Sequence, residues 1–229
     1  MFYQDRDSRE YIVYDQEGFG RFLTRVFKWM LMALLTSGAV AYGVVSLLPT
    51  NMAIPVMFVG IIAQIVIVVK MFKLSKLSLK SMFGVFAAYS VTTGITMSVI
   101  YYRFSLANIV ISFLAAAVFF GVMALYGATT KKDLTKLGSL GVVSLITIIA
   151  LTLVNIFLRF SVLDLLLAYA GVAVFLALTA YDVKKLKDIY YESNGLVGER
   201  EVLMGAFTLY LEFMNLFIRI LEILGREKK

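Results

Sequence analysis

Seven long apolar runs, separated by short polar segments, constrain the fold of this chain more than any other feature. The runs cover about residues 29–48, 54–69, 82–101, 106–126, 137–158, 162–181 and 202–224. A hydrocarbon layer of ~30 Å requires a helix of about 20 apolar residues. Within lipid each segment must satisfy its own backbone N–H and C=O groups, so every run should be helical. The sequence therefore predicts an all-α, polytopic membrane protein, a bundle of seven transmembrane helices.

The composition supports a membrane protein and excludes several kinds of site. Hydrophobic residues make up 61% of the 229 residues and charged residues only 16%, whereas ordinary soluble domains carry about 25% charged residues. The chain contains no cysteine and no histidine. Disulfides, common zinc sites and catalytic pairs that need these side chains are therefore excluded. We expect neither an enzyme nor a resident cofactor.

The charged residues divide the chain into three parts and predict its orientation. We expect residues 1–28 to form a cytoplasmic N-terminal tail with an interfacial helix, residues 29–225 the transmembrane domain, and residues 226–229 a C-terminal tail. The basic residues concentrate in segments expected on one side, namely Arg21, Arg25, Lys28, Lys70, Lys73, Lys76, Lys80, Lys131, Lys132, Lys136, Lys184, Lys185, Lys187 and Arg200. The other side has only Arg103 and Arg159 in its loops, so the positive-inside rule makes the first side cytoplasmic. This distribution explains the net charge of +7 without a nucleic acid partner.

The last apolar run leaves the topology open in one respect. An odd number of spans places the basic C-terminal tail outside the cytoplasm, against the positive-inside rule. Either the seventh run crosses the membrane against its charge, or it is re-entrant and returns to the cytoplasmic side.

The seventh run also carries a polar stripe. Glu212 lies near its middle, and a carboxylate at membrane depth costs from about 2.5 kcal/mol upward. The stripe consists of Thr208, Glu212, Asn215, Arg219 and Glu222, whose spacings of three and four place them on one helix face. We expect the last helix to be central, with this stripe lining a polar path. The alternative is a set of buried hydrogen bonds that only fix helix packing.

Asp182, at the cytoplasmic end of the sixth run, is the second candidate. Taken alone it could be an ordinary helix-end carboxylate, with Lys185 one turn on. Beside Glu212 it would form a pair that cannot easily ionise twice, and that would share a proton and respond to pH. The same carboxyl oxygens would suit transient binding of Ca²⁺.

Two segments resemble the Bax inhibitor family of membrane proteins. They are Ala-Tyr-Asp at 180–182 with Lys-Lys-Leu-Lys at 184–187, and Leu-Tyr-Leu-Glu-Phe-Met-Asn-Leu-Phe at 209–217. The resemblance implies a seven-helix bundle with a central last helix, and an acidic pair that controls a pH-sensitive calcium leak. The positions of that pair match Asp182 and Glu212, although the family usually has Asp at the second. It also implies a basic latch residue, Lys73 or Lys76 here. Bacterial members often have Glu where this chain has Gln64.

The leading functional hypothesis is thus a passive calcium leak in a prokaryotic inner membrane, gated by protonation of the acidic pair. We expect a monomer with a cytoplasmic N-terminus that interacts with lipid, calcium ions and protons. A second hypothesis is an interaction protein that binds a membrane protease or a stress-response partner without transporting ions. The sign of the pH response stays open at this point.

Overall fold

The computed structural model of the chain describes residues 4–71 and 78–225, of which 4–17, 53 and 68–71 are described by their backbone alone. The elements are α1 (Gln4–Leu47), η1 (Thr50–Met52), α2 (Ala53–Met71), α3 (Leu79–Met97), α4 (Ile100–Arg103), α5 (Leu106–Thr129), α6 (Thr135–Leu158), α7 (Ser161–Glu192) and α8 (Glu199–Leu224). No residue in these described ranges lies in a β-strand, which confirms the predicted all-α class.

Six helical segments in the described part of the chain are long and apolar enough to cross a membrane. They are Gly18–Leu47, Thr50–Ile67, Leu79–Arg103, Leu106–Thr129, Thr135–Leu158 and Ser161–Glu192. These segments coincide with the first six predicted runs, so the chain has the helices of a polytopic membrane protein. The seventh run coincides with α8, which has 26 residues but is not one of the six.

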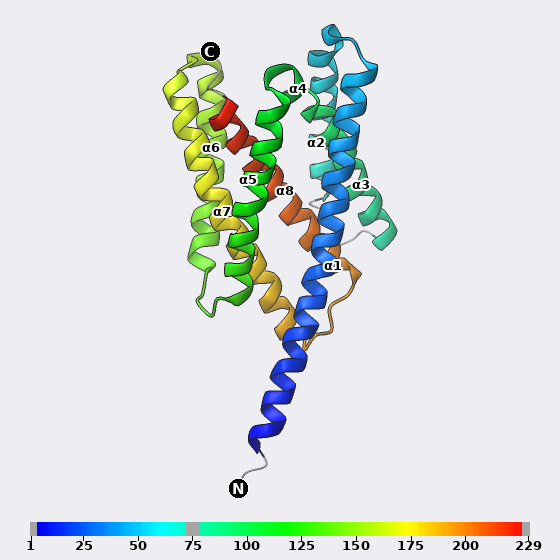
Figure 1. Cartoon of the computed structure of the whole chain (residues 1–229), viewed down its shortest axis with the longest axis vertical. Helices are drawn as coiled ribbons and strands as arrows, with labels where there is room; N and C mark the ends of the chain where they lie inside the picture. Colours follow the sequence, from blue (N-terminus) through cyan, green and yellow to red (C-terminus); the bar gives the residue numbers. More distant parts are fainter. Residues whose placement is uncertain (1–3, 72–77, 226–229) are drawn as a thin grey trace.

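The helices form two groups on either side of α8. On one side α3 packs against α1 and α2, and on the other α7 packs against α5 and α6. We call these the α1–α3 group and the α5–α7 group. Helix α8 runs obliquely between them (Figure 1) and contacts α1, α3, α5 and α7. Both faces of α8 therefore meet other helices along its length.

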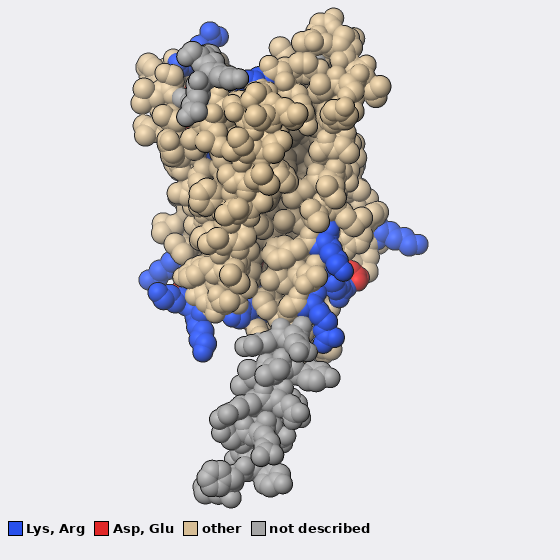
Figure 2. Space-filling view, viewed as in Figure 1, with Lys and Arg blue, Asp and Glu red and all other residues tan. Residues whose placement is uncertain are grey.

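The two ends of the bundle differ in charge. Figure 2 shows lysine and arginine side chains gathered at the end from which the N-terminal part of α1 extends. We call this the basic end and the opposite one the far end. At the basic end Arg25 of α1 forms an ion pair with Glu199 at the start of α8, and the Lys187 ammonium of α7 donates to the Thr130 carbonyl after α5. In the described part of the chain, three segments predicted to be cytoplasmic thus lie at one end, namely the N-terminal segment, the α5–α6 loop and the α7–α8 loop.

Helix α1 crosses residue 28 without a break. The segment predicted as an interfacial helix continues into the first apolar run, and Phe19 and Phe22 are buried against Tyr190 of α7. This part of α1 is therefore a packed extension of the bundle at the basic end.

Small residues permit close contacts between helices, because they let the backbones approach each other. A Cβ atom on Gly94 of α3 would lie 2.5 Å from the Ser37 carbonyl oxygen of α1. One on Gly127 of α5 would lie 2.3 Å from the Ala180 carbonyl oxygen of α7. Both positions bring backbone against backbone, which a side chain would prevent.

Candidate functional site

The polar stripe of α8 faces α7 along most of its length. Glu212 is only 5% exposed, and its carboxyl group interacts with the side chains of Asp182 and Thr179. Towards the far end, Arg219 packs so closely on Gly171 of α7 that a Cβ atom there would lie 2.9 Å from the Arg219 Cγ. The seam between α7 and α8 therefore contains the charged side chains of Asp182, Glu212 and Arg219.

The carboxyl groups of Asp182 and Glu212 interact with each other across the seam between α7 and α8. Ionised carboxylates only accept hydrogen bonds, so two in contact repel each other unless one holds a proton. No N–H or O–H group in the described chain is a hydrogen-bond partner of Glu212 Oε2, which is completely buried. The surroundings of Glu212 thus offer its Oε2 atom no hydrogen-bond donor that would stabilise a negative charge.

Asp182 connects this pair to a pocket at the basic end. The pocket has a volume of about 130 Å³ and its lining includes Asp182, Lys185, Glu201, Gly205 and Thr208. Asp182 is half-buried, whereas Glu212 lies beyond the pocket and is buried. Of the two carboxyl groups, Asp182 therefore lines the pocket and Glu212 does not.

A larger cavity of about 930 Å³ opens at the far end of the same seam. Its polar lining comprises Arg103, Thr152, Asn155, Arg159, Ser161, Asp164, Arg219 and Glu222. Arg219 Nη1 donates to Glu222 Oε2 at 2.9 Å. The last two residues of the stripe therefore belong to this cavity and not to the surroundings of Glu212.

The stripe consequently does not form one continuous path in this conformation. Glu212 and Arg219 are seven residues apart, a rise of about 10 Å along α8. Between them Asn215 donates its side-chain amide to the Leu211 carbonyl of its own helix at 2.8 Å. Apolar packing fills the same level, with Phe213 and Phe217 of α8 against Phe113 of α5. A barrier thus separates the basic-end pocket from the far-end cavity.

The predicted latch residues Lys73 and Lys76 lie outside the described residues. Among those that are described, Lys185 lines the pocket together with Asp182. Lys184 instead forms an ion pair with Asp188 on its own helix. Thr179 was not among the predicted site residues, although it lies one turn before Asp182 and the helical period places both on one face.

The opposite face of α8 carries a second, neutral set of polar contacts, which we call the neutral network. Tyr210 Oη lies 2.7 Å from Ser37 Oγ of α1, and Ser37 Oγ donates to the Ser90 carbonyl of α3 at 2.8 Å. Gln64 of α2 donates to Thr93 Oγ1 at 2.8 Å, which supplies the partner that its place in an apolar run required. The network ties α8 to α1 through Tyr210 and Ser37, and it ties both α1 and α2 to α3.

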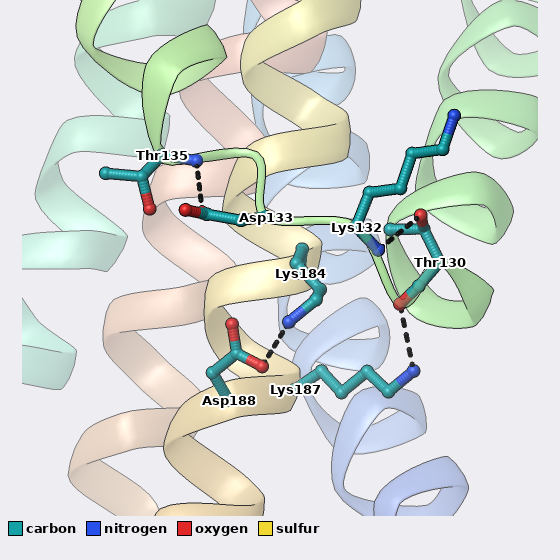
Figure 3. A network of polar contacts seen from close by, with 7 residues as sticks. All are labelled: Thr130, Lys132, Asp133, Thr135, Lys184, Lys187 and Asp188. Atoms are coloured by element: carbon teal, nitrogen blue, oxygen red, sulfur yellow. Dashed lines mark hydrogen bonds and ion pairs between the residues drawn. The ribbon is translucent and has the colours of Figure 1, made fainter.

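The loop between α5 and α6 docks on α7 at the basic end (Figure 3). Asp133 Oδ1 accepts from the Thr135 backbone N–H at 2.8 Å, and Lys187 donates to the Thr130 carbonyl at 3.4 Å. Hydrogen bonds from the side chain and backbone of Thr135 lower the pKa of Asp133. These contacts hold the basic end of α7 close to the loop, one turn beyond Asp182.

Fold and site together define a class, namely an all-helical membrane protein with a carboxyl pair between its last two helices. The family model described as inhibitor of apoptosis-promoting Bax1 matches residues 20–229. The chain belongs to the Bax inhibitor family.

Similar proteins come from several bacteria. The inner membrane protein YbhL of Escherichia coli K12 is 37% identical over 228 residues, covering 95% of this chain and 96% of the relative. An uncharacterized protein of Rickettsia prowazekii is 34% identical, covering 93% and 92% of the two chains. One from Deinococcus radiodurans is 31% identical, covering 88% and 89%. The names of these relatives specify at most an inner-membrane location.

Proposed function

We propose that the protein is a pH-sensitive passive calcium leak whose gate is the Asp182–Glu212 pair. The observation that carries the proposal is the contact between these two carboxyl groups, one buried and one lining the basic-end pocket. A group that titrates inside a helix seam can change how the two helices pack. The proposal involves no chemical reaction and no resident cofactor.

The proposed topology has seven spans with the basic end in the cytoplasm. Helix α8 supports a seventh full crossing because it is unbroken over 26 residues, about 39 Å at 1.5 Å per residue. Its last turn reaches the far end, where Gly225 packs against Phe104. A re-entrant segment would instead turn back towards the basic end. We therefore propose a cytoplasmic N-terminus in an inner membrane and a central last helix in a monomer.

In the proposed closed state a shared proton joins the two carboxyl groups and holds α8 against α7. Loss of this proton leaves two negative charges in contact within a poorly solvated seam, and their repulsion separates the helices. Separation would join the basic-end pocket to the far-end cavity across the barrier around Asn215. The leak should therefore increase as the pH rises through the titration of the pair, which behaves as one coupled unit.

Calcium would contact the pair only in passing. A tight calcium site takes six to eight oxygen ligands, and no group of three or more acidic side chains that could hold a metal is found in the described part of the chain. Two carboxylates would attract a calcium ion but bind it weakly, and weak binding is what a permeant ion requires.

The test is calcium flux into liposomes that hold a calcium dye, measured from pH 6 to pH 8. The Glu212→Gln variant keeps a permanent hydrogen-bond donor at the pair, so its leak should be low and independent of pH. Asp188→Asn is the matched control because it removes a carboxylate from α7 outside the pair and should retain the pH response. Equal pH dependence in Glu212→Gln and the wild type would contradict the gate. Absence of flux at every pH would contradict the leak itself and favour the interaction protein.

A further inference from the structure

The far-end cavity collects every basic side chain that the structure describes at that end of the bundle. These are Arg103 at the end of α4, Arg159 directly after α6, and Arg219 of α8. The positive-inside rule accounts for basic residues at the basic end but gives no reason for arginines here. Their convergence on one cavity from three separate segments calls for a different explanation.

The turn between α6 and α7 has the local structure needed to hold Arg159 at this cavity. Arg159 is a non-glycine residue with φ 56° and ψ 34°, in the left-handed region, which such residues rarely adopt. Asn155, only 3% exposed, accepts from the Phe160 N–H at 3.0 Å and donates to the Asp164 carboxylate at 2.5 Å. These buried hydrogen bonds fix the turn and therefore the direction in which Arg159 leaves it.

The charges of the cavity do not balance. Its lining contains three arginines and two carboxylates, Asp164 and Glu222. Glu222 pairs with Arg219 and Asp164 accepts from Asn155. In the described part of the chain, Arg103 and Arg159 have no carboxylate partner, and the Arg103 guanidinium lies over the ring of Phe104. Two guanidinium groups are thus available to an anion with several acceptor oxygens, which the arginine fork binds in a bidentate manner.

The surroundings of the cavity are those of a lipid-facing site. Phe104, Ile156 and Leu167 provide apolar lining. Phe157 at the end of α6 and Val162 at the start of α7 are 85% and 69% exposed. Lipid acyl chains would cover these side chains. A volume of about 930 Å³ lies in the range of small-molecule sites and exceeds what a single inorganic ion requires.

We propose that the far-end cavity is a phosphate-binding site, held by Arg103, Arg159 and Arg219, that takes the headgroup of an anionic phospholipid from the far-end leaflet. The phosphate chemistry is shared with free inorganic phosphate, and the experiment separates the two sources. The inference is independent of the calcium leak and of the Asp182–Glu212 pair.

The experiment measures lipid binding to the full chain in detergent by native mass spectrometry and by thermal shift. The probes are phosphatidylglycerol, phosphatidylcholine and inorganic phosphate, each added separately. The wild type should bind phosphatidylglycerol more tightly than phosphatidylcholine, and high salt should weaken the difference. Inorganic phosphate should compete only at much higher concentration, because it lacks the acyl chains.

The decisive variant is Arg103→Gln with Arg159→Gln. It should lower the affinity for phosphatidylglycerol about tenfold or more, since it removes two charge-assisted contacts. Lys131→Gln with Lys132→Gln removes the same charge from the basic end and should bind like the wild type. Arg103→Lys with Arg159→Lys keeps the positive charge but loses the planar guanidinium groups that bind phosphate in a bidentate manner. Its affinity for phosphatidylglycerol should lie between those of the wild type and the glutamine variant.

Three outcomes would overturn the site. The first is that the wild type binds the two phospholipids equally and that inorganic phosphate does not compete with either. The second is an unchanged affinity in both the glutamine and the lysine variants. The third is stabilisation by calcium alone that Asp164→Asn abolishes, which would make the cavity a cation site. Competition by inorganic phosphate at the same concentration as the lipid would instead identify the free anion as the ligand.

Discussion

The two faces of α8 use polar residues in opposite ways. Towards the α1–α3 group, Tyr210 joins the neutral network, where hydroxyl and amide groups find partners on neighbouring helices. Towards α7, Glu212 faces another carboxyl group and its Oε2 atom has no hydrogen-bond donor in the described chain. The polar groups on one face have hydrogen-bond partners, whereas the other face buries a carboxyl oxygen that has none in the described chain.

Under the proposed gate, this difference leads us to expect that the seam of α8 with the α1–α3 group stays fixed and the seam with α7 moves. Aromatic packing accompanies the neutral network, with Phe86 and Tyr89 of α3 against Tyr210 of α8. Within the α1–α3 group, α3 approaches α1 closely at Gly94. The α7 seam has a cavity at each end and a titratable pair between them. A change of protonation should therefore move α8 relative to α7 while its contacts with the α1–α3 group persist. The following predictions test that contrast, from the largest expected effect to the smallest.

The largest effect is expected from Asp182→Asn combined with Glu212→Gln. This variant removes the titratable groups of the α7 seam but keeps hydrogen-bonding side chains, so the pH dependence of calcium flux should disappear. We expect at least a tenfold lower leak than the wild type at pH 8, equivalent to about 1.4 kcal/mol. A remaining pH response would show that a different group gates the leak.

Gly94→Ala should destabilise the packing of α3 against α1, inside the α1–α3 group, by overpacking. Its Cβ atom would meet the Ser37 carbonyl oxygen at 2.5 Å, and overpacking of this kind costs about 1–3 kcal/mol. The measurement is the unfolding free energy in detergent. Gly121→Ala is the matched control, because its Cβ atom would have no neighbour within 4 Å. Equal stability of the two variants would contradict the close α1–α3 contact.

Tyr210→Phe should separate stability from gating. It removes the hydroxyl that contacts Ser37 and should cost about 0.6–1.5 kcal/mol of stability, as expected for one hydrogen bond between helices. The pH profile of the leak should remain that of the wild type. A shifted profile would mean that the neutral network takes part in gating.

The smallest effect is expected at Asp133, outside the membrane-spanning helices. Its pKa is lowered from the ordinary value of 3.8, so its hydrogen bonds stabilise the folded state above that pH and are lost as the pH falls through the lowered value. Asp133→Ala should therefore be slightly less stable than the wild type at pH 7, with a difference that narrows below pH 3.8. Lys132→Ala, which keeps the backbone contact to Thr130, should show no such change.

Much of the fold could be predicted from residue types and spacing, and the same reasoning proposed the Asp182–Glu212 pair. Long apolar runs can satisfy their backbone in lipid only as helices, and the helical period placed Glu212 on the polar face of the last one. Asp182 became a candidate because two neighbouring carboxylates cannot easily both ionise, so a second one near a membrane end is expected to pair with Glu212. These inferences use only the types of residues and their spacing along the chain, which can be read directly from the sequence.

The remaining features depend on how distant segments pack. Helical spacing showed that Arg219 and Glu222 share a face with Glu212, but not that packing around Asn215 divides the stripe into two environments. Arg103 and Arg159 could be placed only near the outer surface, because nothing in their local sequence indicates a common cavity. The continuous α1 likewise reflects burial of Phe19 and Phe22 against α7, a contact between residues far apart in the chain.

The most direct test of the account is infrared detection of the shared proton. Difference spectra of the purified protein across pH 6–8 should contain the C=O stretch of a protonated carboxylic acid, which decreases over the pH range in which calcium flux increases. The band should be absent from the Asp182→Asn/Glu212→Gln variant and retained in Asp188→Asn. A wild-type protein without this band at the pH of lowest leak would have both carboxyl groups ionised, and the proton-held gate would be wrong.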